Sequence, residues 1–451
     1  MGGVRATHMV SRRRALQVVG AGLLGLAGCT GRNDGQGATP PDSTQPPDST
    51  QPPRPTDPGG TGTPTSDPLE AVDVEGASPE WGRDLSAPIR SDPAYADGHL
   101  VVAAGGTVFG LDAESGETAW TLDAPATPEG EHERYDATIR VHDGVVYALL
   151  GVGFGVGGSD YTLVALDPDG SERWRYESDL TRYHEVAGFA DGAVVLPTHD
   201  DALSPDGERA IAVDLADGAE RWRAATGDAF DGAVGDDVVT VEAAGLVLDC
   251  FDLDTGDRRF RFEPGEDASV DSSAIGDGLV FAAAPVYGGG RPSLYAFDPA
   301  DGAEVWSDGT ATTTMVRYLD DLYVGGSALR RLGPDGTERW RYDPGGFLTG
   351  VPVDDGSIYT NARSRVVAID RGDGSERWGV EATRRTHTVA RGDDSVVAMD
   401  GERGITMALS TEDGRERWRA SLPHEYEPRP ATSDEAAFLV TEDGAVLSVP
   451  I

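Results

Sequence analysis

Short apolar runs recur along most of the chain, and turn-forming residues bound each of them. Within the runs, apolar and polar or small residues alternate with a period of two, the spacing of a half-buried β-strand. Asp-Gly pairs introduce several runs: Asp97-Gly98 precedes "HLVVAA", and Asp143-Gly144 precedes "VVYALL". No long stretch follows the helical period. The pattern predicts many short strands joined by tight turns.

One phrase is repeated along the chain and ends each time in an aromatic residue, as in "ALDPDGSERW". A strand closes with a small residue, an apolar residue and usually Asp, and the aromatic residue follows a glycine by four positions. Asp accepts hydrogen bonds from turn amides and Gly tolerates positive φ, so the phrase predicts a β-hairpin. The aromatic positions are Trp120, Trp174, Trp222, Phe260, Trp306, Trp340, Trp378 and Trp418. The glycines are Gly116, Gly170, Gly218, Gly256, Gly302, Gly336, Gly374 and Gly414.

Each repeat is long enough for four short antiparallel strands, and one such sheet cannot bury both of its faces alone. Sheets stacked radially as propeller blades can. The repeated aromatic residue then serves as a wedge between neighbouring blades, burying roughly 150–250 Å². That area is worth at most about 5 kcal/mol per wedge before entropy is counted. Repeated tryptophan is therefore expected to be core rather than a ligand cage.

The phrase Ala-x-Asp-x-x-x-Gly-x-x-x-Trp resembles the tryptophan-docking motif of PQQ-like β-propellers, which include quinoprotein alcohol dehydrogenases and BamB-type lipoprotein scaffolds. The resemblance covers about residues 75–451 and implies an all-β propeller of four-stranded blades, eight in number in the family. We place the propeller domain at residues 71–451. The chain itself offers nine countable units: eight hairpins, and a last unit, "AAFLVTEDGAVLSVPI", that lacks one. If the strand near Trp81 completes this last sheet, the ring is closed by the two ends of the domain.

The N-terminus reads as an export signal followed by a spacer. Residues 1–28 combine Arg12-Arg13 with a short apolar run and resemble a twin-arginine signal peptide. The run ends in "LAGC", which resembles a lipobox and predicts lipidation of Cys29 at the outer face of the cytoplasmic membrane. An uncleaved anchor and a misread start, with Met9 in place of Met1, are the alternatives. Residues 29–70, rich in Pro, Thr and Ser, predict a disordered, extended stalk.

Charge narrows the choice of partners. The chain has a formal net charge of −41, a pI near 4.3 and no lysine. Such a surface repels nucleic acid and anionic membranes, which argues against both as partners of the folded domain. The composition resembles that of halophile proteins, with an acidic mesophile protein as the alternative. Of the two cysteines, Cys250 lies in an apolar strand pattern and is expected to be a small buried side chain, so no disulfide framework is predicted. We expect a monomer.

Two groups of loops on one propeller face are candidate sites. The longest connections between second and third strands are residues 151–161, 198–208 and 285–292, a candidate contact surface for a membrane or surface protein. Loops between blades carry four histidines, each beside polar or acidic residues, and these are candidates for a metal or anion site: His132, His184, His387 and His424. The alternative is that these are separate polar loops. No cofactor is predicted. PQQ stays open through the family resemblance alone. Calcium stays open because turns such as "DPDG" resemble fragments of calcium loops, but no copy has the full ligand set, which favours ordinary turn chemistry.

These features favour a non-enzymatic, lipid-anchored scaffold for protein interaction. A solute- or glycan-binding receptor is the main alternative. A PQQ-dependent dehydrogenase is a further alternative that only the resemblance supplies. Those enzymes hold the quinone with calcium and a catalytic Asp, and many have adjacent cysteines. The chain has no adjacent cysteines, and no position matches the catalytic Asp.

Overall fold

The regular structure is built from β-strands. The computed structural model describes residues 72–89, 91–124, 134–153, 159–178, 183–184, 186–190, 192–199, 209–226, 229–243, 247–265, 268–285, 293–309, 313–343, 356–362, 364–382, 386–400, 403–422 and 430–451 of the 451-residue chain. The predicted signal peptide, residues 1–28, and the predicted stalk, residues 29–70, lie outside these ranges. Within them, no helix is long and apolar enough to cross a membrane.

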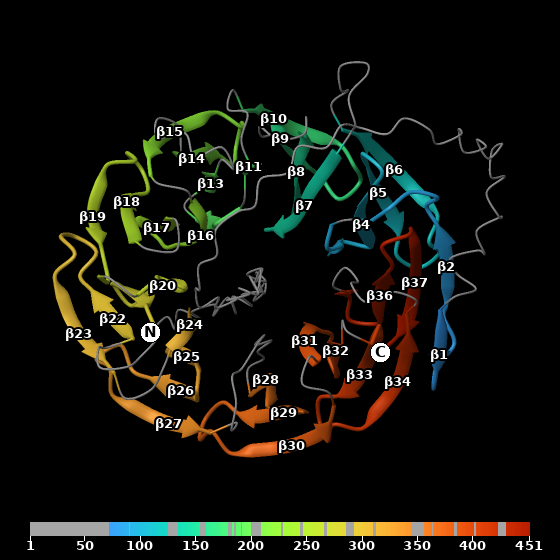
Figure 1. Ribbon diagram of the computed structural model, residues 1–451. Coiled ribbons are helices and arrows are strands. Elements are labelled where there is room, and N and C mark those ends of the chain that lie inside the picture. The colour runs from blue at the N-terminus through green and yellow to red at the C-terminus, as the bar shows by residue number, and fades with distance from the viewer. Residues whose placement is uncertain are drawn as a thin grey trace, which may run out of the picture. The chain divides into compact units, whose positions relative to one another are not determined.

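The described strands form nine antiparallel sheets, arranged around a common centre in Figure 1 and numbered here as blades 1–9 in chain order. Blade 1 contains β3 (Ala94–Ala96), β4 (His99–Ala104), β5 (Thr107–Asp112) and β6 (Thr118–Asp123). Blade 2 contains β7 (Arg134–His142), β8 (Val145–Gly153), β9 (Ser159–Leu166) and β10 (Glu172–Glu177). Blade 3 contains β11 (Tyr183–His184), β12 (Gly188–Ala190), β13 (Ala193–His199), β14 (Arg209–Asp214) and β15 (Glu220–Ala225). Blade 4 contains β16 (Ala229–Val234), β17 (Val238–Ala243), β18 (Val247–Asp252) and β19 (Arg258–Phe262).

The second half of the ring continues the same order. Blade 5 contains β20 (Ser272–Gly276), β21 (Leu279–Ala283), β22 (Leu294–Phe297) and β23 (Glu304–Asp308). Blade 6 contains β24 (Thr313–Tyr318), β25 (Leu322–Gly326), β26 (Leu329–Leu332) and β27 (Glu338–Tyr342). Blade 7 shows β28 (Ser357–Ala362), β29 (Arg365–Asp370) and β30 (Glu376–Glu381) in its described part. Blade 8 contains β31 (Thr386–Arg391), β32 (Ser395–Asp400), β33 (Ile405–Ser410) and β34 (Glu416–Ser421). Blade 9 contains β35 (Ala431–Thr432), β36 (Ala436–Val440) and β37 (Ala445–Pro450).

Two strands from the start of the domain pair with the last two blades. β1 (Asp73–Glu75) lies along β34 as a fifth strand of blade 8. β2 (Trp81–Asp84) lies along β37, with Trp81 opposite Ser448, and is the fourth strand of blade 9. The family expectation of eight blades is therefore wrong for this chain, because the unit that starts with β35 is a separate blade. The count of nine repeat units agrees with the nine described sheets.

The hairpin chemistry follows the repeated phrase. All eight glycines of the phrase have positive φ, between 71° and 85°, as the motif predicts. In blade 3, the carboxylate of Asp214 accepts a hydrogen bond from the Ala216 amide at 2.8 Å and pairs with Arg221 at 2.8 Å. The Ala216 amide, followed by the Arg221 guanidinium, holds the pKa of Asp214 below its ordinary value. The same pairing of the turn aspartate with the arginine just before the docking aromatic residue occurs in four of the described blades, through Arg173, Arg221, Arg259 and Arg377.

Each seam between blades is apolar and centred on one repeat aromatic residue. Nine clusters of buried side chains occupy the nine seams of the described blades, and one of them joins Leu100 of blade 1 to Phe438 of blade 9. The core is therefore distributed around the ring rather than gathered in one place. This is the expected result for sheets that are apolar on both faces.

The tryptophans contact the next blade in a repeated geometry. The Trp174 indole N–H donates to the Leu215 carbonyl of blade 3 at 2.7 Å, and the ring lies against Gly218 in the same turn. A Cβ atom at Gly218 would lie 2.7 Å from the indole. The same indole bond recurs at other seams, for example from Trp120 to Pro168 at 2.8 Å. The turn glycine therefore has two roles: it adopts positive φ and it leaves room for the neighbouring indole.

Candidate functional site

The three long loops lie at the same end of their blades. The predicted loop 151–161 is partly strand, because β8 continues to Gly153 and β9 starts at Ser159, so residues 154–158 connect the two. Likewise β13 continues to His199, and residues 200–208 connect it to β14. Residues 285–292 lie between β21 and β22. Each therefore joins the second strand of its blade to the third, which places all three on one face of an antiparallel propeller. Most of their residues lie outside the described ranges, so their role as a contact surface stays a prediction.

The four candidate histidines were predicted in the connections between blades, and the structure assigns two of them to strands. His132 and His424 lie outside the described residues. His184 is in β11, with its backbone opposite Thr198, and His387 is in β31, opposite Met399. The side chains of these two residues are not described, so convergence of the histidines also stays a prediction. In the described part of the chain, no group of three or more His, Cys, Asp or Glu residues is arranged to hold a metal ion.

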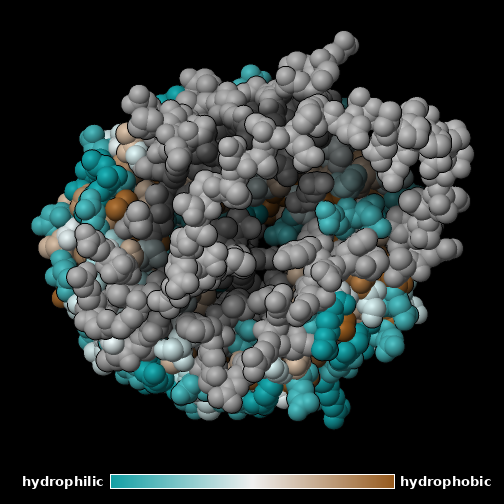
Figure 2. Space-filling model, in the orientation of Figure 1, coloured by the Kyte–Doolittle hydropathy of each residue, from teal (hydrophilic) through white to brown (hydrophobic). Residues whose placement is uncertain are grey.

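The described surface is polar. Figure 2 shows hydrophilic residues over much of the described rim. Among described residues, Val305 is the one large hydrophobic side chain that is strongly exposed, at 53%. Arginines of the outer strands pair with neighbouring acids, as Arg223 does with Glu220 at 2.5 Å. Such exposed pairs are worth little individually, about 0–1 kcal/mol each.

Blade 6 departs from the repeat, and a polar network adjoins the usual docking contact of Trp340 there. In the other repeats a small residue lies opposite the docking aromatic residue, as Ala368 does opposite Trp378, but in blade 6 Arg331 lies opposite Trp340. The turn aspartate is also missing, because Gly333 stands in its place. A guanidinium at this seam needs partners, since a buried charge without them is costly.

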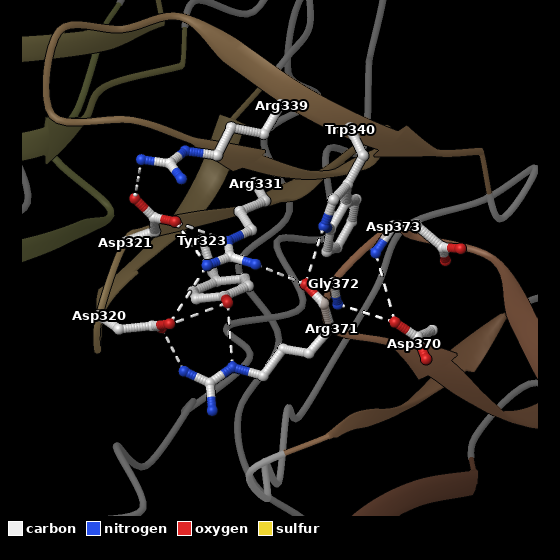
Figure 3. A network of polar contacts seen from close by, with 10 residues as sticks. All are labelled: Asp320, Asp321, Tyr323, Arg331, Arg339, Trp340, Asp370, Arg371, Gly372 and Asp373. Atoms are coloured by element: carbon white, nitrogen blue, oxygen red, sulfur yellow. Dashed lines mark hydrogen bonds and ion pairs between the residues drawn. The ribbon is translucent and has the colours of Figure 1, made fainter.

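The partners come from the first turn of blade 6 and from blade 7 (Figure 3). Arg331 donates from Nε to Asp321 at 2.7 Å and from a terminal nitrogen to the Arg371 carbonyl at 2.8 Å. Its other terminal nitrogen lies 3.2 Å from Asp320. Arg339, which lacks the usual turn aspartate, pairs with Asp321 at 2.9 Å. Asp321 therefore takes over the role that the missing aspartate has in other blades.

Tyr323 is the centre of this network. The Arg331 and Arg371 guanidiniums lie 5.7 and 5.5 Å from its ring centroid, and Arg371 Nε donates to its hydroxyl at 3.0 Å. Burial raises the pKa of Tyr323 even though Arg371 opposes that shift. Burial is the largest single influence on Asp320 and opposes its ionisation, but the bond and charge of Arg371, its own backbone amide and the charge of Arg331 together lower the pKa of Asp320. The network links blades 6 and 7 through charged groups that are all partnered.

A second polar cluster lies between blades 4 and 5 and was not predicted from the sequence. Asp231 of β16 and Glu242 of β17 are opposite each other, and Ser273 of β20 donates to Glu242 at 2.9 Å. The available signal was an acidic residue inside the apolar strand "VVTVEA". For the Figure 3 network, the signal was the arginine pair inside "LRRL". Its second arginine, Arg331, stands where the other repeats have a small residue before the turn.

Comparison with known families agrees with the blade geometry. Residues 49–191, 159–322, 325–389 and 362–450 match the family described as outer membrane protein assembly factor BamB. The chain belongs to this family. The tryptophan phrase had led to the same PQQ-like propeller family. No curated protein sequence matches the chain.

Solved structures of three proteins are similar to this BamB-family chain. BamB from Moraxella catarrhalis is 17% identical, over 83% of this chain and 100% of that chain, with a TM-score of 0.48. The computationally designed Ika8 protein is 14% identical, over 82% and 98%, with a TM-score of 0.49. Quinohemoprotein alcohol dehydrogenase from Comamonas testosteroni is 12% identical, over 85% and 77%, with a TM-score of 0.47.

Proposed function

We propose that this chain is a non-enzymatic scaffold for protein interaction, exported and lipid-anchored at the outer face of the cytoplasmic membrane. The observation that carries the proposal is membership of the BamB family from residue 49 to residue 450, since the family is named for an assembly factor. The partner in this proposal is a membrane or surface protein. Loops 151–161, 198–208 and 285–292 are the proposed contact surface because all three belong to one end of the blades.

The anchor rests on the N-terminal sequence. Arg12-Arg13 would direct export, and Cys29 would carry the lipid. Changing both arginines to lysine should retain the protein in the cytoplasm, whereas Cys29→Ser should leave export intact and release the protein from the membrane. Fractionation followed by immunoblotting measures both effects. Membrane retention of the Cys29→Ser protein would refute a lipid anchor at that residue.

The ring is proposed to be closed by its own N-terminal strand. In support, β2 pairs with β37 in the register that other outer strands use, and the Trp81 indole donates to Ala113 of blade 1 at 2.8 Å. A closed ring leaves no blade face uncovered, so the domain would act as a monomeric, rigid support for its loops. The acidic, lysine-free surface would suit a high-salt environment, where screening relieves self-repulsion.

Crosslinking in intact cells tests the scaffold. The three loops are replaced together by short Gly-Ser turns, and the full-length protein is purified from crosslinked membranes for mass spectrometry. The matched control changes Asp254 and Glu412 to Ser, because both are exposed turn residues at the opposite end of the blades. We expect one stoichiometric partner with the wild type and the control, and loss of that partner with the loop variant.

Two results would overturn the proposal. One is the absence of any partner that depends on the loops. The other is dye-linked dehydrogenase activity of the purified protein after incubation with PQQ and Ca²⁺, which would make the chain an enzyme.

A further inference from the structure

Two acidic side chains lie next to each other in the seam between blades 4 and 5. Asp231 on β16, the inner strand of blade 4, is directly opposite Glu242 on β17. Opposed residues of an antiparallel pair project from the same face with their Cβ atoms about 4.5–5.5 Å apart. Their face is the one that meets blade 5, because Leu248, opposite Glu242 in the sheet, belongs to the apolar cluster of that seam.

Glu242 is enclosed by the neighbouring blade. It is 8% exposed, and the hydroxyl of Ser273 on β20 donates to its carboxyl at 2.9 Å. The Ser273 hydroxyl is itself 2.9 Å from the Thr240 hydroxyl, and Thr240 accepts from the Ala233 amide at 3.0 Å. A chain of hydrogen bonds thus runs from the backbone of β16 through Thr240 of blade 4 to Ser273 of blade 5 and ends on Glu242.

The charges around the pair favour one proton. Asp231 faces Glu242 from its own sheet, and Asp271, just before β20, adds a second like charge from blade 5. The opposing charge is Arg140 of β7, and it acts on Asp231. Burial and then the charge of Asp231 raise the pKa of Glu242 to about 8. Burial also raises the pKa of Asp231, although the Gly232 amide and Arg140 oppose it.

We propose that Asp231 and Glu242 share one proton and act as a pH-sensitive latch on the seam between blades 4 and 5. With the proton bound, the pair carries one charge and Glu242 stays in its bond with Ser273. When the proton leaves, two carboxylates face each other on blade 4 in a seam that excludes most water. Opening of the seam then hydrates both charges and breaks the bond between Glu242 and Ser273 of β20. Two such close carboxyls titrate as a unit rather than as separate sites.

The direction of the pH dependence follows from the raised pKa. The folded protein holds a proton that unfolded glutamate, with an ordinary pKa of 4.5, has already lost. The latch therefore contributes its full stability below about pH 4.5, and that contribution is lost as the pH rises toward about 8. For one proton, the opening equilibrium constant of the seam rises up to about tenfold per pH unit, or about 1.4 kcal/mol.

Hydrogen exchange of β17 and β20 tests the latch in the full-length protein. Opening constants, corrected for intrinsic exchange, are measured at constant salt from about pH 5 to 9 for the wild type, Glu242→Gln and Asp249→Asn. Asp249 is the matched control: it is a fully buried carboxylate on the opposite face of β18, paired with Arg261 at 2.7 and 2.6 Å. We expect a rising opening constant in the wild type, a flat one in Glu242→Gln, and a uniformly higher one with the wild-type slope in Asp249→Asn.

An infrared titration of the folded protein provides a second readout that does not depend on stability. The wild type minus Glu242→Gln difference spectrum should contain a protonated carboxyl band at neutral pH that disappears by about pH 9. The proposal is overturned by the absence of that band. It is equally overturned if Glu242→Gln keeps the wild-type pH slope.

Discussion

The docking of Trp174 on Gly218 gives a prediction whose size follows from the structure. Gly218 has a φ of +74°, and an added Cβ would lie 2.7 Å from the Trp174 ring. Gly144 has a φ of +76°, and an added Cβ would meet nothing within 4 Å. Alanine therefore strains the backbone equally at both positions, by about 1–2 kcal/mol. Only Gly218→Ala also displaces an indole.

The extra cost at Gly218 comes from the packed seam. Trp174 is 7% exposed and is held by its bond to the Leu215 carbonyl, so it has little room to move. Overpacking of this kind costs about 1–3 kcal/mol. We expect Gly144→Ala to lower the free energy of unfolding by about 1–2 kcal/mol and Gly218→Ala to lower it by about 2–5 kcal/mol. Urea denaturation followed by far-UV circular dichroism measures both.

A double-mutant cycle with Trp174→Ala isolates the contact. Trp174→Ala alone should cost about 3–5 kcal/mol. In that background the indole is gone, so Gly218→Ala should cost only its backbone strain, and the coupling energy should be about 1–3 kcal/mol. Equal costs at Gly218 and Gly144 in the wild-type background would refute the docking argument. So would a cycle that is additive to within about 0.5 kcal/mol.

Three shorter predictions concern other seams. Arg331→Ala should lower the free energy of unfolding in urea by about 1.5–3 kcal/mol, because the buried carboxylate of Asp321 loses one of its two guanidinium partners and keeps Arg339 alone. The control Arg415→Ala, which removes an exposed ion pair with Asp413, should lower the free energy of unfolding by less than about 1 kcal/mol. Equal losses for the two variants would contradict the network's role. Phe260→Trp should raise the free energy of unfolding by about 1 kcal/mol through a new indole bond to the next turn. Calorimetry measures the change, and no gain would contradict the prediction. Burial raises the pKa of the Cys250 thiol to about 12, so Cys29→Ser protein should not react with a thiol reagent at pH 8 until it is unfolded.

Much of the fold could be predicted because one physical unit is repeated. The turn phrase fixes a hairpin, and the aromatic residue at a fixed distance after the turn requires a neighbouring sheet to bury it. The number of blades followed from counting units, including Trp81 at the start. The family resemblance suggested eight, but blade number depends on how many copies the chain contains, and the motif does not encode that.

The polar seams could be predicted less well, because they depend on register between strands. The sequence shows that Arg331 occupies a position where other repeats have a small residue. It does not show the partners, because Asp320 belongs to blade 6 and Arg371 to blade 7. Glu242 was visible as an acid in an apolar strand. Its pairing with Asp231 depends on a register shift between Ala229 and Asp231, and no residue there signals such a shift.

The seam between blades 4 and 5 and the seam between blades 6 and 7 should respond to salt in opposite directions. Between blades 4 and 5, the ionised carboxyl pair is repulsive, so screening stabilises the seam once its proton has left. Between blades 6 and 7, the contacts of Arg331 with Asp320 and Asp321 are attractive, so screening by salt weakens them. The contact with Asp321 is weakened least, because that side chain is buried. The overall charge of −41 adds a general gain in stability with salt. A ring whose seams were all alike would respond to salt as one body. In this ring, salt and pH select which seam is the weakest, because some of the described seams add charged side chains to the repeated apolar contact. Another example is Arg330, 2% exposed, which pairs with Asp308 across blades 5 and 6.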